Sequence, residues 1–173
     1  MKGWSRIGCL VMLCAMVGCS PIPNKYLRQS ETGATLTTIQ RNATYYQGKL
    51  VVLGGVIMEE EALDGRLWLH VKNRPLDQDY RPQLPPSPDD PEGGWYWAVV
   101  GSQMNFPSTH RHWGDMIVVG RVAGLASGKE PILNIVYARG WGVSSAHDGV
   151  WEHLVDANYV PYLPVSAVGE GGQ

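Results

Sequence analysis

The residue with the clearest chemistry is a cysteine near the start of the chain. Cys19 follows Gly18 and a short apolar pair, an order that fits the lipobox, in which the cysteine thiol accepts a diacylglycerol. Lys2, Arg6 and an uncharged run over 7–17 precede it, as in a signal segment, and this run is too short to cross a bilayer as a stable helix. We therefore expect cleavage before Cys19 and fatty acids such as palmitate on this residue, since two or more acyl chains anchor a protein stably.

Two alternatives to this anchor are an ordinary secreted protein and an N-terminal membrane helix. A plain secretory signal more often ends in A-x-A, whereas residues 16–18 read MVG. The sequence therefore favours a lipoprotein with a signal peptide over 1–18. Ser20 follows the acylated cysteine, at a position where Asp retains lipoproteins in the inner membrane of many Gram-negative bacteria. Ser20 thus predicts transport to the outer membrane.

The remaining cysteines and the charge exclude several classes of protein. Cys9 and Cys14 lie in the signal segment, so the mature chain would have no thiol for catalysis, disulfides or zinc. Loss of Lys2 and Arg6 with that segment takes the formal net charge from −2 to −4. No basic block occurs, which argues against nucleic acid as a partner.

Two further groups of residues could do chemistry. His110 and His112 have the spacing of two ligands on one strand face, but no third metal ligand lies in a convincing register. Ser144, His147 and Asp148 include the residue types of a hydrolase triad, in a glycine-flanked loop without a nucleophile elbow. We expect no metal, no cofactor and no enzymatic activity, with an envelope hydrolase using Ser144 and His147 as an alternative.

The elements that position these residues are mostly strands. Alternating or β-branched apolar runs predict five of them, and Gly54-Gly55 inside the first indicates a bulge or sharp bend. Asp64-Gly65 predicts a hairpin turn beside the solvated Glu59-Glu60-Glu61 run. A short helix is predicted over 37–46, and a proline-rich loop over 82–92. The predicted strands are 49–58, 66–72, 95–100, 115–122 and 132–137.

These elements predict a mainly β chain with one domain. The expected fold is a small five- to six-stranded, OB-like, partly open barrel, because a bent first strand and short turns curl a sheet on itself. The barrel domain would cover 37–165, after a lipidated flexible tether over 19–36 and before a disordered tail over 166–173. The segment after residue 140 is rich in glycine, serine and proline, so we expect it to be irregular.

The chain resembles the Slp family of outer-membrane lipoproteins through short features in a fixed order. After the lipobox these are residues 46–49 (YQGK), 54–57 (GGVI), 67–71 (LWLHV), 74–77 (RPLD) and 114–124 (GDMIVVGRVAG), with Tyr137 beyond the next strand. The resemblance implies a Gram-negative cell-envelope protein, lipid-anchored in the outer membrane and linked to starvation and stress. It implies no known activity. The chain departs from the family at 95–97, which reads WYW where the family tends to carry Gly-Arg-Phe.

Trp68 is the residue that strand periodicity leaves unexplained. It shares one face of the second strand with Arg66, His70 and Lys72, while the other face is apolar. Either a loop or the C-terminal segment covers this indole, or Trp68, Arg66 and His70 form a surface for an envelope protein partner. The predicted role is a non-enzymatic binding or scaffolding module. A carrier of an apolar ligand is the second alternative, although five short strands enclose little volume.

Overall fold

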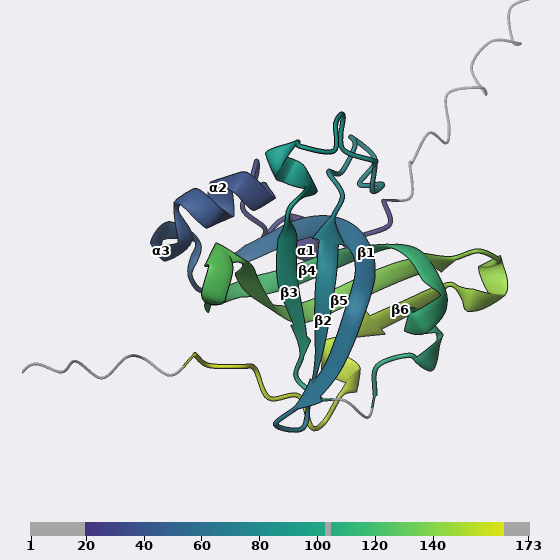
Figure 1. Ribbon diagram of the computed structural model, residues 1–173. Helices are drawn as coiled ribbons and strands as arrows, with labels where there is room; N and C mark the ends of the chain where they lie inside the picture. Colours follow the sequence, from purple (N-terminus) through teal and green to yellow (C-terminus); the bar gives the residue numbers. More distant parts are fainter. Residues whose placement is uncertain (1–19, 103–104, 165–173) are drawn as a thin grey trace, which may run out of the picture.

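The computed structural model describes residues 20–102 and 105–164. The signal segment, Cys19 and the tail from 165 onward lie outside the described residues. Within them, six strands form one sheet in the order β3-β2-β1-β4-β5-β6 (Figure 1). The strands are β1 (Leu50–Leu63), β2 (Arg66–Asn73), β3 (Trp95–Val100), β4 (Trp113–Leu125), β5 (Pro131–Gly142) and β6 (Gly149–Glu152).

The first five strands close into a barrel. Closure is made by a parallel pairing of β3 with β5, in which Trp97, Ala98 and Val99 face Ile132, Leu133 and Asn134. All other pairings are antiparallel. This strand order is that of an OB-fold, with β6 added at the free edge of β5, so the predicted fold class is confirmed. The parallel pairing makes the barrel closed rather than partly open.

Strand β1 bends sharply and pairs with two neighbouring strands (Figure 1). It pairs with β4 as far as Gly55 and with β2 from Gly55 onward. A Cβ on Gly55 would lie 2.4 Å from a methyl group of Val71, so only glycine allows the strands to approach this closely. The bend thus lies where the sequence predicts it, while the register bulge lies between Ile57 and Glu59.

The β1–β2 hairpin extends beyond the barrel. Asp64 and Gly65 form its turn with φ angles of 52° and 73°, as in the two-residue hairpin turns that Asp-Gly favours. Residues 59–63 of β1 are exposed and include the three glutamates. Charged side chains on such an edge discourage pairing with other chains.

The barrel interior is filled by side chains. Its main core includes Leu69, Tyr96, Met116, Leu133 and Trp151, each at most 2% exposed. A second core lies outside the barrel wall, where helix α1 (Asn24–Leu27) covers β4 and β5. Helices α2 (Leu36–Arg41) and α3 (Ala43–Tyr46) replace the single predicted helix and meet at Asn42.

The segment 20–36, for which the sequence predicts a flexible tether, lies against the barrel. Ile22 and Tyr26 are only 1% and 5% exposed, and the Tyr137 hydroxyl donates to the Pro21 carbonyl at 2.9 Å. Ser30 also bridges to Leu50 at the start of β1. This packing arises because Ile22 and Tyr26 are buried against the outer surface of β4 and β5. No local sequence pattern predicts this contact.

Candidate functional site

The outer face of β2 and β3 carries aromatic and charged side chains next to one another. Along β2, Leu67, Leu69 and Val71 are buried in the barrel, whereas Arg66, Trp68, His70 and Lys72 alternate with them on the outer face. On β3, Trp95 and Trp97 point to the same outer face, while Tyr96 and Ala98 are buried. The alternation predicted for β2 is therefore present, and β3 adds two indoles beside it.

These side chains form a continuous row of rings. The His70 imidazole lies between the Trp95 and Trp97 indoles, with centroid distances of 4.6 Å and 4.3 Å and interplanar angles of 25° and 14°. Trp68 meets Trp97 edge to face at 6.0 Å, and Tyr162 meets Trp68 at 4.8 Å. We call Trp95, His70, Trp97, Trp68 and Tyr162 the aromatic row.

Charged groups fix the His70 end of the row. His70 Nε2 lies 3.1 Å from a carboxylate oxygen of Glu130, which directly precedes β5. Lys72 places its ammonium 4.7 Å from the Trp95 ring centroid, a favourable cation–π arrangement. The row therefore links β2 and β3 to the approach of β5, close to where the barrel closes.

The C-terminal segment covers the Trp68 end of the row. Arg66 Nε donates to the Val160 carbonyl at 3.2 Å, and the Asn134 side chain and Tyr162 backbone exchange two hydrogen bonds of 2.8 Å and 2.7 Å. Trp68 Nε1 is buried, with no acceptor among the described residues. This arrangement agrees with a cover over Trp68. The other end of the row is formed by Trp95, His70 and Trp97, which are partly exposed.

The stacking limits what this surface can bind. Each face of His70 meets an indole, and Lys72 lies over Trp95. A sugar or a base needs a free ring face for stacking. The row offers mainly ring edges and rigid apolar area, which suit a protein surface better than a stacked ligand.

The candidate hydrolase residues are close in space but do not form a triad. Ser144 Oγ lies 3.1 Å from His147 Nδ1, in the loop that holds η4 (Ser145–His147). The Asp148 carboxylate accepts from the Gly142 backbone N–H at 3.0 Å instead of orienting His147. Ser144 and Asp148 are exposed, so nothing excludes water from this pair.

The two candidate metal ligands point to different partners. They lie on the 3-10 helix η2 (Ser108–His112) rather than on a strand. His110 is buried, with Nδ1 2.7 Å from the Pro107 carbonyl and Nε2 2.6 Å from Glu60, while His112 lies against His147. Within residues 20–102 and 105–164, no group of three or more potential ligands could hold a metal ion.

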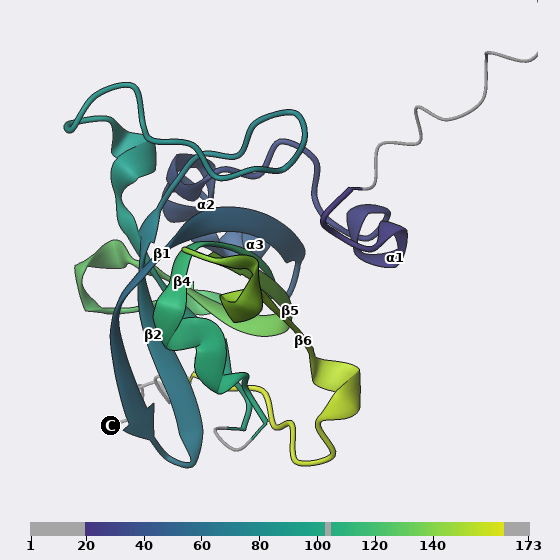
Figure 2. The same cartoon turned by 90° about the vertical axis from the view of Figure 1, so that its right-hand side faces the viewer.

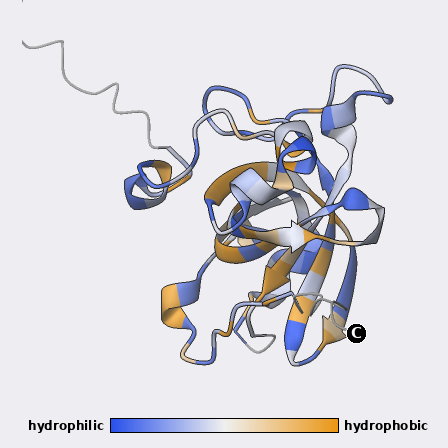
Figure 3. Ribbon diagram, turned by 90° about the vertical axis from the view of Figure 1, so that its left-hand side faces the viewer, coloured by the Kyte–Doolittle hydropathy of each residue, from blue (hydrophilic) through white to orange (hydrophobic). Residues whose placement is uncertain are grey.

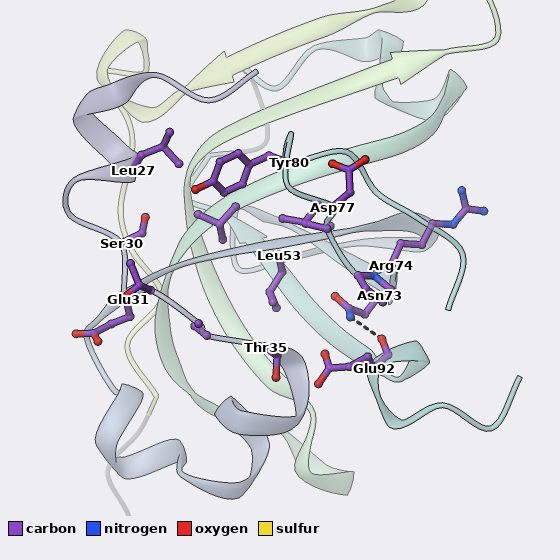
Figure 4. Close-up of a pocket in the computed structure, with 17 residues that line it drawn as sticks. Leu27, Ser30, Glu31, Thr35, Leu53, Asn73, Arg74, Asp77, Tyr80 and Glu92 are labelled. Atoms are coloured by element: carbon purple, nitrogen blue, oxygen red, sulfur yellow. Dashed lines mark hydrogen bonds between the residues drawn. The ribbon is translucent and has the colours of Figure 1, made fainter. Parts of the chain in front are cut away.

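A cavity outside the barrel lies between the N-terminal segment and the β2–β3 loop (Figure 4). It has a volume of about 290 Å³, at the lower limit of small-molecule sites. At one end the Glu92 carboxylate accepts from the backbone N–H groups of Leu36 and Thr37, each at 3.0 Å, and the Asn73 amide donates to the Glu92 carbonyl. Because this carboxylate caps α2, the cavity is mainly a structural joint, and it is small for a lipid.

The two predicted anchoring residues lie at the start of the part of the chain that the structure describes. Cys19 lies outside it, and Ser20 is the first described residue, with its hydroxyl accepting from the Ile22 N–H at 3.3 Å. Acylation of Cys19 and sorting by Ser20 thus remain predictions. None of the helices in the described part is long and apolar enough to span a membrane.

Sequence reasoning identified Arg66, Trp68 and His70 but missed their neighbours on β3 and β5. The run WYW at 95–97 gives no such signal, because three consecutive aromatic residues do not alternate between polar and apolar. What the sequence lacks is the register that pairs His70 with Trp97. Glu130 gave no signal, because a carboxylate beside a turn is ordinarily a solvated residue.

Comparison with known proteins gives one match. The sequence model of the outer membrane lipoprotein Slp family matches residues 16–162, including the lipobox and all six strands. Searches of curated proteins and of solved structures found no match. The match confirms the resemblance drawn from the sequence, together with the outer-membrane, lipid-anchored location that it implies. The chain belongs to the outer membrane lipoprotein Slp family.

Proposed function

We propose that this lipoprotein is a non-enzymatic binding module, anchored through Cys19, that holds an envelope protein at the end of the aromatic row formed by Trp95, His70 and Trp97. The observation that carries the proposal is the stack of His70 between Trp95 and Trp97, with Lys72 beside it. Tryptophan is among the side chains that contribute most of the energy of protein–protein contacts. The barrel makes this surface rigid, because Leu69 and Tyr96 of the same two strands are buried in its core.

The absence of catalysis is part of the proposal. Its support is the arrangement of Ser144, His147 and Asp148, where the carboxylate is bound to Gly142 and the serine is open to solvent. A serine hydrolase requires the base to be oriented by a third group and the transition state to be shielded from water. An active-site serine probe should therefore leave Ser144 and Ser145 unlabelled.

A link to starvation or stress also belongs to the proposal, and its support is the family membership alone. If it holds, the amount of the protein in the outer membrane should rise when cells exhaust their carbon source. Constant abundance under starvation and envelope stress would remove this part without affecting the binding surface.

Crosslinking in cells tests the binding surface. The variants are Trp95→Ala and Lys72→Glu, and the matched controls are Tyr45→Ala and Arg41→Glu, an exposed aromatic and an exposed cation outside the row. Envelope proteins captured by the parent chain should be lost from both row variants and retained by both controls. Equal capture by all four chains at equal abundance would refute the aromatic row as the binding surface.

A further inference from the structure

The point at which the chain leaves the barrel restricts how the protein can sit on its membrane. Only three peptide bonds separate Cys19 from Ile22, which is 1% exposed. A fully extended chain spans at most about 3.5 Å per residue, so the acylated cysteine lies within about 11 Å of a buried contact. The side of the barrel that carries α1 must therefore lie close to the bilayer surface.

Exposed apolar side chains lie on this same side. Figures 2 and 3 show α1 and the short helix η5 (His153–Val155) on one side of the molecule, while the β1–β2 hairpin lies on the opposite side. On η5, Leu154 and Val155 are 68% and 72% exposed. Large apolar side chains beside a lipid anchor suit contact with acyl chains rather than with water.

A cavity of about 240 Å³ opens between α1, β4 and η5. Leu50 and Val136 give it an apolar base, and Lys25, Arg121 and His153 give it cationic or potentially cationic walls. Leu154 forms part of the same wall, so the cavity is continuous with the apolar surface of η5. A pocket with an apolar base, basic walls and an apolar rim matches the headgroup end of a phospholipid.

The donors of this cavity are positioned by the fold. Arg121 donates from Nη1 to the Gly48 carbonyl at 3.2 Å, which leaves most of the five guanidinium N–H groups for a ligand. His153 Nδ1 lies 3.0 Å from the Val136 carbonyl and must donate to it, which fixes the imidazole at the cavity wall. Lys25 is held by Glu152, which also accepts from the Tyr26 hydroxyl.

Glu152 remains ionised in this arrangement. Burial acts to raise the pKa of Glu152, but the hydrogen bonds from Lys25 and Tyr26 outweigh it and lower the pKa. Burial and the bond to Glu152 raise the pKa of Tyr26, which stays protonated as the donor. Glu152 thus fixes Lys25 at the mouth of the cavity, and Arg121 carries the charge that is left for an anion.

We propose that this cavity binds the phosphate-bearing headgroup of a phospholipid in the membrane that holds Cys19, with Leu154 and Val155 inserted among the acyl chains. The inference rests on the anchoring part of the proposed function and is independent of the aromatic row. The charge distribution supports the same orientation. Four acidic residues lie in the β1–β2 hairpin, on the side opposite α1 (Figure 2): Glu59, Glu60, Glu61 and Asp64.

Calorimetric titration of the mature acylated protein in neutral detergent tests the pocket, with short-chain phosphatidylglycerol as the probe. Arg121→Ala should weaken this binding about fivefold, the value of one cation near an anionic lipid surface. Arg41→Ala, an exposed arginine that does not line the cavity, should leave it unchanged. No binding by the parent chain, or equal weakening by both variants, would overturn the proposal. Inorganic phosphate binding as tightly as the lipid would identify a site for free phosphate and would also overturn it.

A thiol reporter tests the orientation. With Cys19 acylated, the mature chain has no other cysteine, so Val155→Cys and Leu63→Cys each introduce a single thiol. In phosphatidylglycerol vesicles, a water-soluble maleimide should label Leu63→Cys on the hairpin much faster than Val155→Cys on η5. Equal labelling rates would show that η5 does not face lipid. Fatty-acid analysis of the same preparations shows separately whether the anchor is present, so failure of the anchor is distinguishable from failure of the pocket.

Discussion

The imidazole of His70 lies nearly parallel to the indole of Trp97, with ring centroids 4.3 Å apart and planes inclined by 14°. The two residues face each other across β2 and β3, and Trp97 in turn pairs with Ile132 of β5. Glu130 approaches the same imidazole from the start of β5. The stack is therefore part of the closure of the barrel as well as part of its surface.

Replacement of His70 by alanine should destabilise the barrel. It removes two ring contacts and the hydrogen bond to Glu130, which together contribute about 2–3 kcal/mol at ordinary values for such interactions. Urea denaturation would measure the loss in the free energy of unfolding. His112→Ala is the control, because His112 is exposed and should change stability little. Equal stability of the two variants would mean that the stack contributes nothing to closure.

Trp68→Ala distinguishes the two explanations offered for this residue. If the C-terminal segment covers the indole, as its contact with Tyr162 indicates, the variant should lose about 2–4 kcal/mol of stability. Thermal and urea denaturation of the variant and of Tyr45→Ala provide the comparison. An unchanged stability together with the loss of a crosslinked partner would instead support direct binding through Trp68.

Val119→Asp should prevent or severely weaken folding. Val119 is fully buried in β4, between Val52 and Tyr137, and an unpaired carboxylate there costs on the order of several kcal/mol. Val150→Asp is the matched control, because Val150 is 55% exposed on β6. A melting temperature of Val119→Asp equal to that of the parent would contradict the position of β4 in the core.

Cys19→Ser tests the anchor directly. Without the thiol, no diacylglycerol can be attached, so radioactive palmitate should not enter the protein and the signal segment should stay uncut or be cut elsewhere. Gel fluorography and the mass of the chain would report both effects. Cys14→Ser, within the signal segment, should label normally. Continued palmitate incorporation in Cys19→Ser would place the acyl chains elsewhere.

Glu60 should make stability depend on pH. Burial acts to raise its pKa, but hydrogen bonds from His110 and Arg111 outweigh it and lower the pKa in the folded chain. A carboxylate whose pKa is lowered by folding stabilises the fold at pH values above its ordinary pKa of 4.5. This contribution is lost as the pH falls below 4.5 and passes through the lower pKa of the folded chain. Glu60→Gln should thus lower stability at pH 7 and flatten its acid dependence. The exposed neighbour Glu61→Gln should retain the acid dependence of the parent.

The strands could be predicted because polar and apolar residues alternate, or apolar residues follow one another, over short stretches of the sequence. The run RLWLHVK alternates in hydrophobicity, and its burial follows that pattern residue by residue. The closure of the barrel could not be predicted, because the parallel pairing of Trp97 with Ile132 joins strands that are distant in sequence. Strand β6 and helix α1 are only four residues long, too short for any periodicity to show.

The candidate site was predictable on one strand only. Periodicity places Trp68 and His70 on one face of β2, but it says nothing of which residues lie opposite them on β3. The stack depends on register, and register depends on the whole sheet. In the same way, the cavity beside α1 combines Lys25, Arg121 and His153 from three separate parts of the chain, so no local motif marks it.

The bond between Tyr26 and Glu152 has a consequence for the order of folding during export. These residues are 126 positions apart, yet Tyr26 lies only seven residues after Cys19. This bond between α1 and β6 can form only after β6 has been exported, so the contact belongs to a late stage of folding. Contacts of such long sequence separation slow folding. Until the barrel has formed, Ile22 and Tyr26, which the folded chain buries, are exposed within a few residues of the expected anchor at Cys19.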